Sequence, residues 1–245
     1  MDAGPLAVAV ADRAARPSRP AGAGLEKGMA ATIDAPLSNG EPFHLERQRK
    51  RPRPTTGRGL RTYDALLLSA KTLLGESGFE RLTTNDICAR AALTPPAFYH
   101  YFRDKYDILE EIAYDLLNRQ NEAMFTWLFN GGTWRILEDP TAAAEEWYRV
   151  AGGIISDEPG ALWTLRAIRA LPALASVRTA SQRLLTDRLL DVFKPLLSHV
   201  DADLLWRRFR ISCELGYMVD ELSLEEDRVP RHVIFAEVAR LAGRL

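Results

Sequence analysis

The sequence has few cysteines and no long apolar run, and each shortage excludes a class of protein. Its 245 residues include two cysteines, Cys88 and Cys213, which lie far apart in the chain. Two distant cysteines give no disulfide framework, so we expect a reducing compartment, the cytoplasm. No apolar run approaches the ~20 residues that a membrane-spanning helix needs. The run Leu6–Ala11 is too short for a secretory signal and follows no basic residue, so we expect no signal peptide.

The sequence also lacks the motifs of the common catalytic sites. It has no glycine-rich phosphate loop, no nucleophile elbow and no His-Glu-x-x-His pattern. The four histidines are scattered without metal-ligand spacing: His44, His100, His199 and His232. The acidic run Glu225–Asp227 lies between two expected helices, as solvated loops often do. We therefore expect no metal, no cofactor and no catalytic residues, and a helical enzyme remains only an alternative.

The charge of the chain is almost balanced. Lysine and arginine total 32, aspartate and glutamate total 33, and the formal net charge is −1. Such a balance excludes a protein coated in nucleic acid, so any positive charge that binds DNA must be local. The hydrophobic share of 47% and the length suffice for a small module and a larger one with its own core.

Residues 1–57 are rich in alanine, proline, glycine and arginine and show no sustained period, which predicts a disordered tail. Met29 offers an alternative start within it. The end of the tail is basic and contains Arg47, Arg49, Lys50, Arg51, Arg53 and Arg58. This basic stretch has two interpretations: a solvated linker, or a flexible arm that lies along phosphates or in a minor groove. Its position directly before the next motif favours the arm.

The stretch from Thr83 to Lys105 carries three helix-start signals within a short span. Thr83 and Asp86 form a Thr-x-x-acid capping pair, in which the hydroxyl accepts from a free amide of the first turn. Thr94 is expected to cap a second helix, with Pro95 at a first position where no N–H is needed. Asp104 caps a third helix. The expected pattern is two short helices and a tight turn, followed by a longer helix.

The second of these short helices has two different faces. Phe98 and Phe102 are four residues apart and face inward, whereas Tyr99, His100 and Tyr101 lie on or near the other side. A short helix pair with an exposed polar face on its second member is typical of a helix-turn-helix. The second helix of that motif enters the major groove of DNA.

These residues resemble the DNA-binding region of the tetracycline-repressor (TetR) family of bacterial transcriptional regulators. The resemblance covers more than twenty positions without a gap and rests on Thr83-Thr84, Ile87, Ala91-Ala92-Leu93-Thr94, Phe98-Tyr99-His100-Tyr101-Phe102 and Lys105. The chain departs from the family pattern at Cys88, Ala92 and Ala97. Ala92 replaces the glycine of the turn, and a left-handed residue other than glycine costs about 1 kcal/mol.

The resemblance implies a fold, a function and a set of contacts. The fold is all-α, with a helix-turn-helix domain at 58–106 and a helical ligand-binding and dimerisation domain at 107–245. The function is a regulator of the bacterial cytoplasm, a repressor that binds palindromic operator DNA as a homodimer until a small ligand releases it. Phosphate contacts fall to Thr84, Tyr99, Tyr101 and Lys105. Base contacts fall to Asn85, Pro95, Pro96, Ala97 and His100.

The last two helices are expected at about 203–222 and after Pro230, and both are apolar on more than one side. On the first, small Ser212 and Gly216 would let another helix come close. On the second, the apolar residues are Ile234, Phe235, Val238, Ala239, Leu241, Ala242 and Leu245. Two interpretations stand: a buried helix pair in a monomer, or, as the resemblance implies, a four-helix interface between two subunits.

The C-terminal part is rich in large aromatic residues, which in most helical domains are core. The resemblance implies that some of them line a pocket for a small, largely apolar ligand. The candidates are Trp127, Trp147, Tyr148, Trp163, Phe193, Trp206 and Tyr217. The alternatives are a DNA-binding regulator without a ligand and a helical interaction protein.

Overall fold

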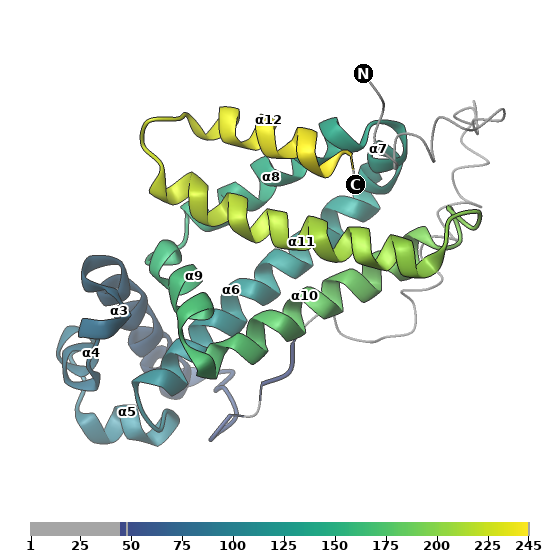
Figure 1. The fold of residues 1–245 in the computed structure, drawn as a ribbon. Helices are drawn as coiled ribbons and strands as arrows, with labels where there is room; N and C mark the ends of the chain where they lie inside the picture. The colour runs from purple at the N-terminus through teal and green to yellow at the C-terminus, as the bar shows by residue number, and fades with distance from the viewer. Residues whose placement is uncertain (1–44, 48, 245) are drawn as a thin grey trace. The chain divides into compact units, whose positions relative to one another are not determined.

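The computed structural model describes residues 45–47 and 49–244, and within them every regular element is a helix. The all-α prediction is confirmed. None of these helices is both long enough and apolar enough to cross a bilayer. Labelled as in Figure 1, they are α3 (Gly57–Arg81), α4 (Thr84–Arg90), α5 (Pro95–Tyr101), α6 (Lys105–Trp127), the π-helical η1 (Leu128–Gly132), α7 (Thr133–Glu138), α8 (Pro140–Ser156), α9 (Ala161–Ala170), α10 (Pro172–Phe193), α11 (Ala202–Glu225) and α12 (Arg231–Ala242).

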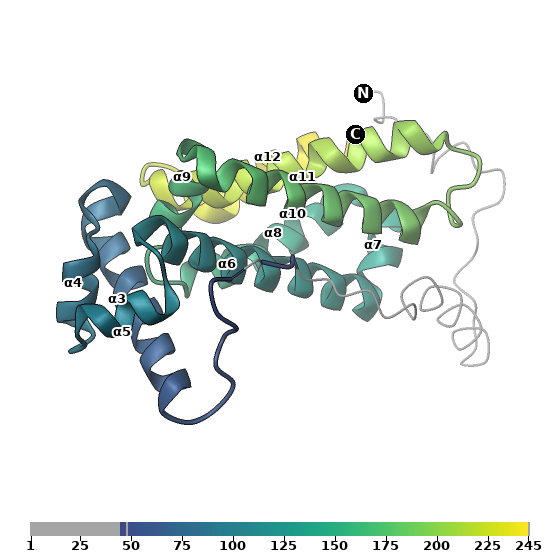
Figure 2. The same cartoon turned by 90° about the horizontal axis from the view of Figure 1, so that it is seen from below.

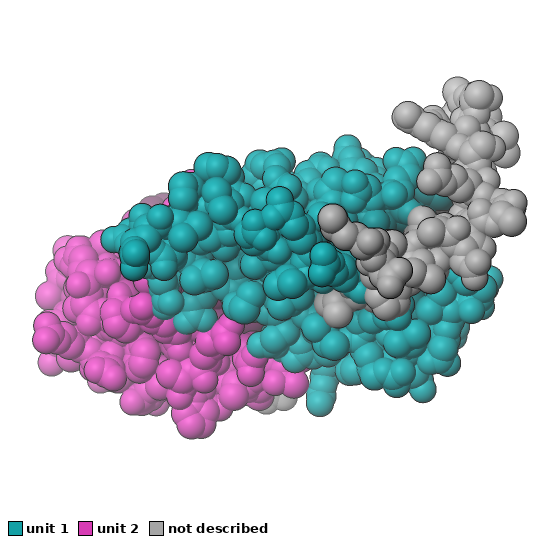
Figure 3. Space-filling model, turned by 45° about the horizontal axis from the view of Figure 1, so that its top comes forward, with its two compact units in different colours: residues 1–44, 121–152, 182–245 teal, residues 45–120, 153–181 magenta. Residues whose placement is uncertain are grey.

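The described residues form two compact units, which Figure 3 shows in two colours. Unit 2 consists of residues 45–120 and 153–181, and the described part of unit 1 consists of residues 121–152 and 182–244. Three helices, α6, α8 and α10, have residues in both units. The expected domain boundaries at 57 and 106 stay predictions, and most of the expected disordered tail lies outside the described residues.

Unit 2 is built around the helix triplet α3, α4 and α5. Each helix turns its apolar residues inward at helical spacing: Tyr63 and Leu66 from α3, Ile87 from α4 and Phe98 from α5 are all at most 2% exposed. Phe102, directly after α5, closes this core, with its ring centroid 5.2 Å from that of Tyr63. These aromatic and apolar contacts hold the short helices α4 and α5 against the long helix α3.

Helix α9 also belongs to unit 2, where it packs against α3. The contact is close because glycines meet: a Cβ atom on Gly75 would lie 3.3 Å from the backbone of Gly160. The ring of Trp163 covers Gly78, where φ is 75° and the backbone of α3 is kinked. Glu158, just before α9, pairs with Lys71 of α3 at 2.7 Å and with Arg119 of α6. Apolar contact and ion pairs together tie α9 to α3.

Unit 1 contains two apolar clusters. The larger one gathers Trp127, Phe193 and Phe209, and the ring centroids of these two phenylalanines are 5.3 Å apart. The smaller one joins Tyr148 of α8 to Phe235 of α12 and to neighbouring residues of α11. Helices α11 and α12 pack side by side, as Figures 1 and 2 both show.

Local signals explain several helix ends in the C-terminal part of the chain. Asp201 caps α11, since its carboxylate accepts a hydrogen bond from Leu204 N at 2.9 Å. Pro172 begins α10, because proline is well suited to a first helical turn. Gly131, within η1, has φ of 99°.

Candidate nucleic-acid interface

The capping signal at Thr83 works as the sequence predicts. Its hydroxyl oxygen accepts from Asp86 N at 3.1 Å, and its hydroxyl donates to the Asp86 carboxylate at 2.5 Å. These reciprocal bonds set the first turn of α4. Ile87 and Cys88 are then buried, and Thr84 and Asn85 stay toward the solvent at the start of the helix.

The turn between α4 and α5 is a Schellman motif. Leu93 N donates to Cys88 O at 2.9 Å, and Ala92 N donates to Ala89 O at 3.2 Å. Such a motif requires a left-handed residue, and Ala92 has φ of 53°. The turn therefore has the tight geometry of the motif even though alanine replaces glycine.

The second helix starts differently from the prediction. Thr94 occupies the cap position in an extended conformation, but its side chain makes no capping bond. The reason is the pair Pro95–Pro96, which removes the first two amides of α5. The next amide, Ala97 N, is bound by the backbone oxygen of Thr94 at 2.9 Å. The prolines therefore start α5 by their fixed φ, without a side-chain cap.

Helix α5 presents one side to the solvent. Pro95, Pro96, Tyr99 and His100 are exposed, whereas Phe98 is completely buried. Tyr99, which is 46% exposed, also reaches toward α4: its hydroxyl lies 3.3 Å from that of Thr84. Two of the predicted phosphate-binding hydroxyls therefore lie together at the exposed junction of α4 and α5.

Tyr101 and Lys105 are more enclosed than the other predicted contacts. The Tyr101 hydroxyl donates to Gly59 O at 3.4 Å, and its ring packs on Tyr63 with a centroid distance of 5.4 Å. The Lys105 ammonium donates to Phe79 O at 3.3 Å and to Glu80 O at 3.2 Å. Lys105 thereby holds the last turn of α3, and only part of its donor capacity is left for a phosphate.

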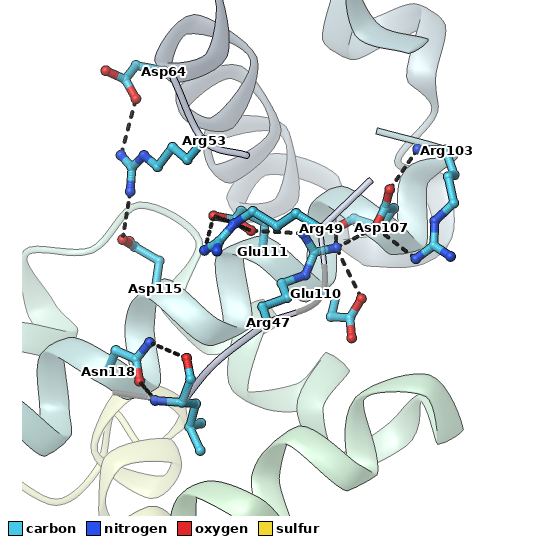
Figure 4. Close-up of polar contacts among 11 residues, drawn as sticks. Arg47, Arg49, Arg53, Asp64, Arg103, Asp107, Glu110, Glu111, Asp115 and Asn118 are labelled. Atoms are coloured by element: carbon cyan, nitrogen blue, oxygen red, sulfur yellow. Dashed lines mark hydrogen bonds and ion pairs between the residues drawn. The ribbon is translucent and has the colours of Figure 1, made fainter. Parts of the chain in front are cut away.

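The basic stretch before α3 is largely bound to the protein's own carboxylates. We call residues 45–47 and 49–56 the strap, and Figure 4 shows it crossing α6. Arg47, with a side chain 2% exposed, donates to Glu111 at 2.9 Å, to Glu110 at 3.1 Å and to the Asp107 carboxylate. Arg49 makes a two-pronged contact with the same Glu111 at 2.9 and 3.0 Å.

The remaining strap residues divide into bound and exposed ones. Leu45 and Asn118 of α6 exchange two hydrogen bonds, of 2.7 and 3.3 Å. Arg53 pairs with Asp64 at 3.2 Å, and the Lys50 ammonium donates to Tyr99 O at 2.7 Å. Arg51 is exposed, as is Arg58 at the start of α3, and neither forms an ion pair with any residue that the structure describes.

The electrostatics of the strap favour its bound form. Burial raises the pKa of Asp107, but hydrogen bonds from the side chain and backbone of Arg103, followed by the charge of Arg47, outweigh it and hold the pKa below its usual value. Removing one partner of a buried ion pair typically costs about 3–5 kcal/mol. A solvent-exposed ion pair is typically worth only about 0–1 kcal/mol. Arg47 is therefore more stable on α6 than on an outside anion.

The predicted pocket residues are separated by the structure. In unit 1, Trp127 and Trp147 lie together, with ring centroids 5.9 Å apart, and Trp206 donates to Asp187 at 2.7 Å. Phe193, Tyr148 and Tyr217 are buried in the same unit. Trp163 is in unit 2, on Gly78 of α3. No group of three or more potential metal-binding side chains occurs in the part of the chain that was described.

The family match lies on the part of the chain that runs from α3 into α6. Residues 66–112 match the profile of "Bacterial regulatory proteins, tetR family". The helix triplet therefore resembles the matching region of TetR-family regulators. The "HTH-type transcriptional repressor KstR2" of Mycolicibacterium smegmatis is 31% identical over 83 residues, which are 34% of this chain and 36% of that protein. The "Transposon Tn10 TetC protein" of Escherichia coli is 38% identical over 48 residues, 20% of this chain and 24% of that protein.

The matches thus span 24% and 36% of the length of these two curated relatives. Solved structures extend the likeness of the fold over most of the chain. Salmonella enterica GusR has a TM-score of 0.56 at 18% identity, covering 78% of this chain and 99% of its own. A putative TetR-family regulator from Syntrophomonas wolfei has a TM-score of 0.52 at 14% identity, covering 74% and 92%. The chain shares the all-helical fold of these two proteins.

Sequence reasoning missed the carboxylates of α6 that hold the strap. Asp107, Glu111 and Asp115 follow one another at spacings of four residues, which places them on one side of α6. Arg47, Arg49 and Arg53 are separated by even numbers of positions, as the members of one side of an extended segment are. An acidic helix side and an alternating basic segment are the signal that could have indicated the contact.

Proposed function

We propose that the protein is a homodimeric transcriptional regulator, a repressor, that binds a palindromic operator through α4 and α5. The observation that carries this proposal is the two-sided α5, which buries Phe98 and exposes Pro95, Pro96, Tyr99 and His100. A helix held so firmly on its inner side can offer its outer side to a major groove without changing shape.

The contacts divide into those that position the protein and those that read sequence. Thr84, Tyr99, Tyr101 and Lys105 are assigned to phosphates, supported by the shared location of the Thr84 and Tyr99 hydroxyls. The base contacts are assigned to Asn85, Pro95, Pro96, Ala97 and His100. The prolines and alanine offer only apolar contact, such as to a thymine methyl, so His100 and Asn85 carry the hydrogen-bonded readout.

The dimer is assigned to α11 and α12. Ile211 and Met218 lie seven residues apart on α11 and are 49% and 38% exposed, and Leu241 of α12 is 55% exposed. Exposed apolar side chains on two neighbouring helices form a surface that a second copy would cover. Two-fold symmetry of the dimer then requires a palindromic operator.

The effector is assigned to unit 1, where Trp127, Trp147 and Phe193 share one apolar cluster. A small, largely apolar molecule bound there would lower DNA affinity only if it prefers a DNA-incompetent arrangement. Coupling of this kind is typically about 1–3 kcal/mol, or 5–150-fold. The second candidate is a regulator without a ligand, and the completely buried Phe193 ring supports it.

Selection of bound genomic fragments, followed by fluorescence anisotropy, tests the DNA-binding assignment. We expect a palindromic sequence, relaxed preference at one base pair for His100→Ala, and uniformly weaker binding for Lys105→Ala. Because Lys105 also holds the end of α3, its variant should melt at a lower temperature than the wild type. Failure of the wild-type protein to select any sequence would remove the proposal.

A thermal-shift screen with apolar metabolites tests the effector separately. A hit should raise the melting temperature, alter tryptophan emission and weaken operator binding at matched concentrations. A screen without any hit, on a protein that does bind its operator, would favour the regulator without a ligand.

A further inference from the structure

The strap divides its arginines into two groups with opposite surroundings. Arg47 and Arg49 point at the carboxylates of α6, as the close-up in Figure 4 shows, and the Arg47 side chain is almost completely buried. Arg51 and Arg58 are exposed and form no ion pair within the described chain. The basic stretch is therefore not one uniform arm.

The exposed pair lies beside the recognition helix. Lys50, the neighbour of Arg51, donates from its ammonium to Tyr99 O at 2.7 Å, which holds this part of the strap on α5. Gly59, the neighbour of Arg58, accepts from the Tyr101 hydroxyl at 3.4 Å. Both exposed arginines are thus one residue away from a direct contact with α5.

We propose that Arg51 and Arg58 bind the sugar-phosphate backbone beside the groove that α5 enters, while Arg47 and Arg49 anchor the strap on α6 and touch no DNA. This inference rests on the proposed function. In this proposal the basic stretch is not a flexible arm but a short segment that is already held on the protein before DNA binds. The partner is double-stranded DNA, recognised by its regular negative charge and not by its bases.

Anchoring explains why the inner arginines are needed. Asp107 and Glu111 are buried on α6, and the side chain of Glu111 is 1% exposed. Two buried carboxylates beside a DNA-binding surface would repel both each other and the phosphates. Arg47 and Arg49 neutralise them where they stand, so the positive charge of Arg51 and Arg58 is not cancelled by the acidic side of α6.

The test measures DNA affinity as a function of salt, together with thermal unfolding. The probe is a labelled mixed-sequence duplex, because phosphate contacts do not depend on sequence. We expect Arg51→Ala and Arg58→Ala each to weaken binding about eightfold at about 0.1 M salt and to reduce the salt slope by about 0.9. Neither variant should change the melting temperature. Arg183→Ala, an exposed arginine of α10 in unit 1, is the matched control and should change neither quantity.

Arg47→Gln should do the opposite. It removes a buried partner of Asp107 and Glu111, so the melting temperature should fall by roughly 10 °C while the salt slope of the folded protein stays the same. If this variant does not fold, Arg47→Lys keeps the charge but loses the forked contact, and should lower the melting temperature by less.

The outcomes separate this inference from the proposed function. Unchanged affinity and slope in both Arg51→Ala and Arg58→Ala, with a wild-type protein that binds the duplex, would overturn the strap assignment alone. A reduced slope without a change in melting temperature for Arg47→Gln or Arg47→Lys would also overturn it, because that arginine would then contact DNA. A wild-type protein that binds no duplex at any salt concentration would overturn both.

Discussion

Ala92 occupies the position of the turn between α4 and α5 that requires a left-handed backbone. Among the described residues it is the non-glycine residue with positive φ, 53°. In this conformation the Cβ atom of alanine lies too close to the neighbouring carbonyl oxygen, which costs about 1 kcal/mol or slightly more. The Schellman hydrogen bonds around it keep the turn closed despite that cost.

Ala92→Gly should therefore stabilise the protein, because it relieves a strain of about 1 kcal/mol. The gain is reduced by the larger conformational entropy of glycine in the unfolded chain. Chemical denaturation measures the change. Ala89→Gly, three residues earlier in the last turn of α4, is the matched control and should destabilise by up to about 1 kcal/mol. Equal effects of the two glycines would mean that φ at residue 92 is not the source of the strain.

At the scale of elements, α9 is held to α3 where two glycines meet. Gly160 has φ of 71°, and a Cβ atom there would overlap the carbonyl of Lys71 and lie 3.1 Å from Gly75 N. The obstructing atoms belong to the backbone of a long helix, so they cannot move aside as a flexible side chain would. Trp163 on Gly78 and the Glu158–Lys71 ion pair reinforce the same contact.

Gly160→Ala should destabilise the protein by about 2–4 kcal/mol, combining the left-handed backbone with the overlap. The control is Gly153→Ala in α8, where a Cβ atom would meet nothing within 4 Å. That control should be neutral or stabilise by about 0.5–1 kcal/mol, since alanine suits a helix interior better than glycine. Thermal unfolding compares the two, and a harmless Gly160→Ala would show that α9 can leave α3 at little cost.

At the scale of the whole molecule, an almost neutral chain contains both an acidic helix side that is neutralised internally and apolar side chains that are exposed. The acidic side of α6 is neutralised by the strap, and exposed apolar side chains remain on α11 and α12. The small Gly216, predicted to admit another helix, faces Tyr148 of the same chain, where a Cβ atom would lie 3.9 Å from its ring. The surface that we propose for a second subunit is therefore the one with Ile211, Met218 and Leu241.

The double variant Ile211→Glu/Leu241→Glu should be a monomer, because burying two carboxylates in an apolar interface is costly. Sedimentation velocity at micromolar concentration measures the change against a dimeric wild type. Leu68→Glu, which alters a leucine of α3 that is 59% exposed, is the control and should leave the dimer intact. A monomeric wild type, free and on DNA, would contradict the assignment of a dimer.

The helix-turn-helix could be predicted from the sequence because its signals are local. Thr83 and Asp86 define the start of α4 by their own hydrogen bonds, and Phe98 and Phe102 indicate the inner side of α5 by their spacing. The left-handed residue at Ala92, where φ is 53°, was expected from the family resemblance, because the family pattern has the turn glycine at that position. Caps, turns and helical periodicity depend on residues a few positions apart, so no knowledge of the fold was needed.

Only the tertiary structure decided which of these side chains are already occupied. In the sequence, Arg47 and Arg51 belong to one basic stretch. In the structure, Arg47 is buried against the Asp107 carboxylate, sixty residues away, whereas Arg51 is exposed. The same holds for Lys105, whose ammonium meets the end of α3, and for Trp163, which packs on Gly78. Composition states which charges and rings a chain contains. Their partners depend on contacts between distant residues, which only the packing of the helices determines.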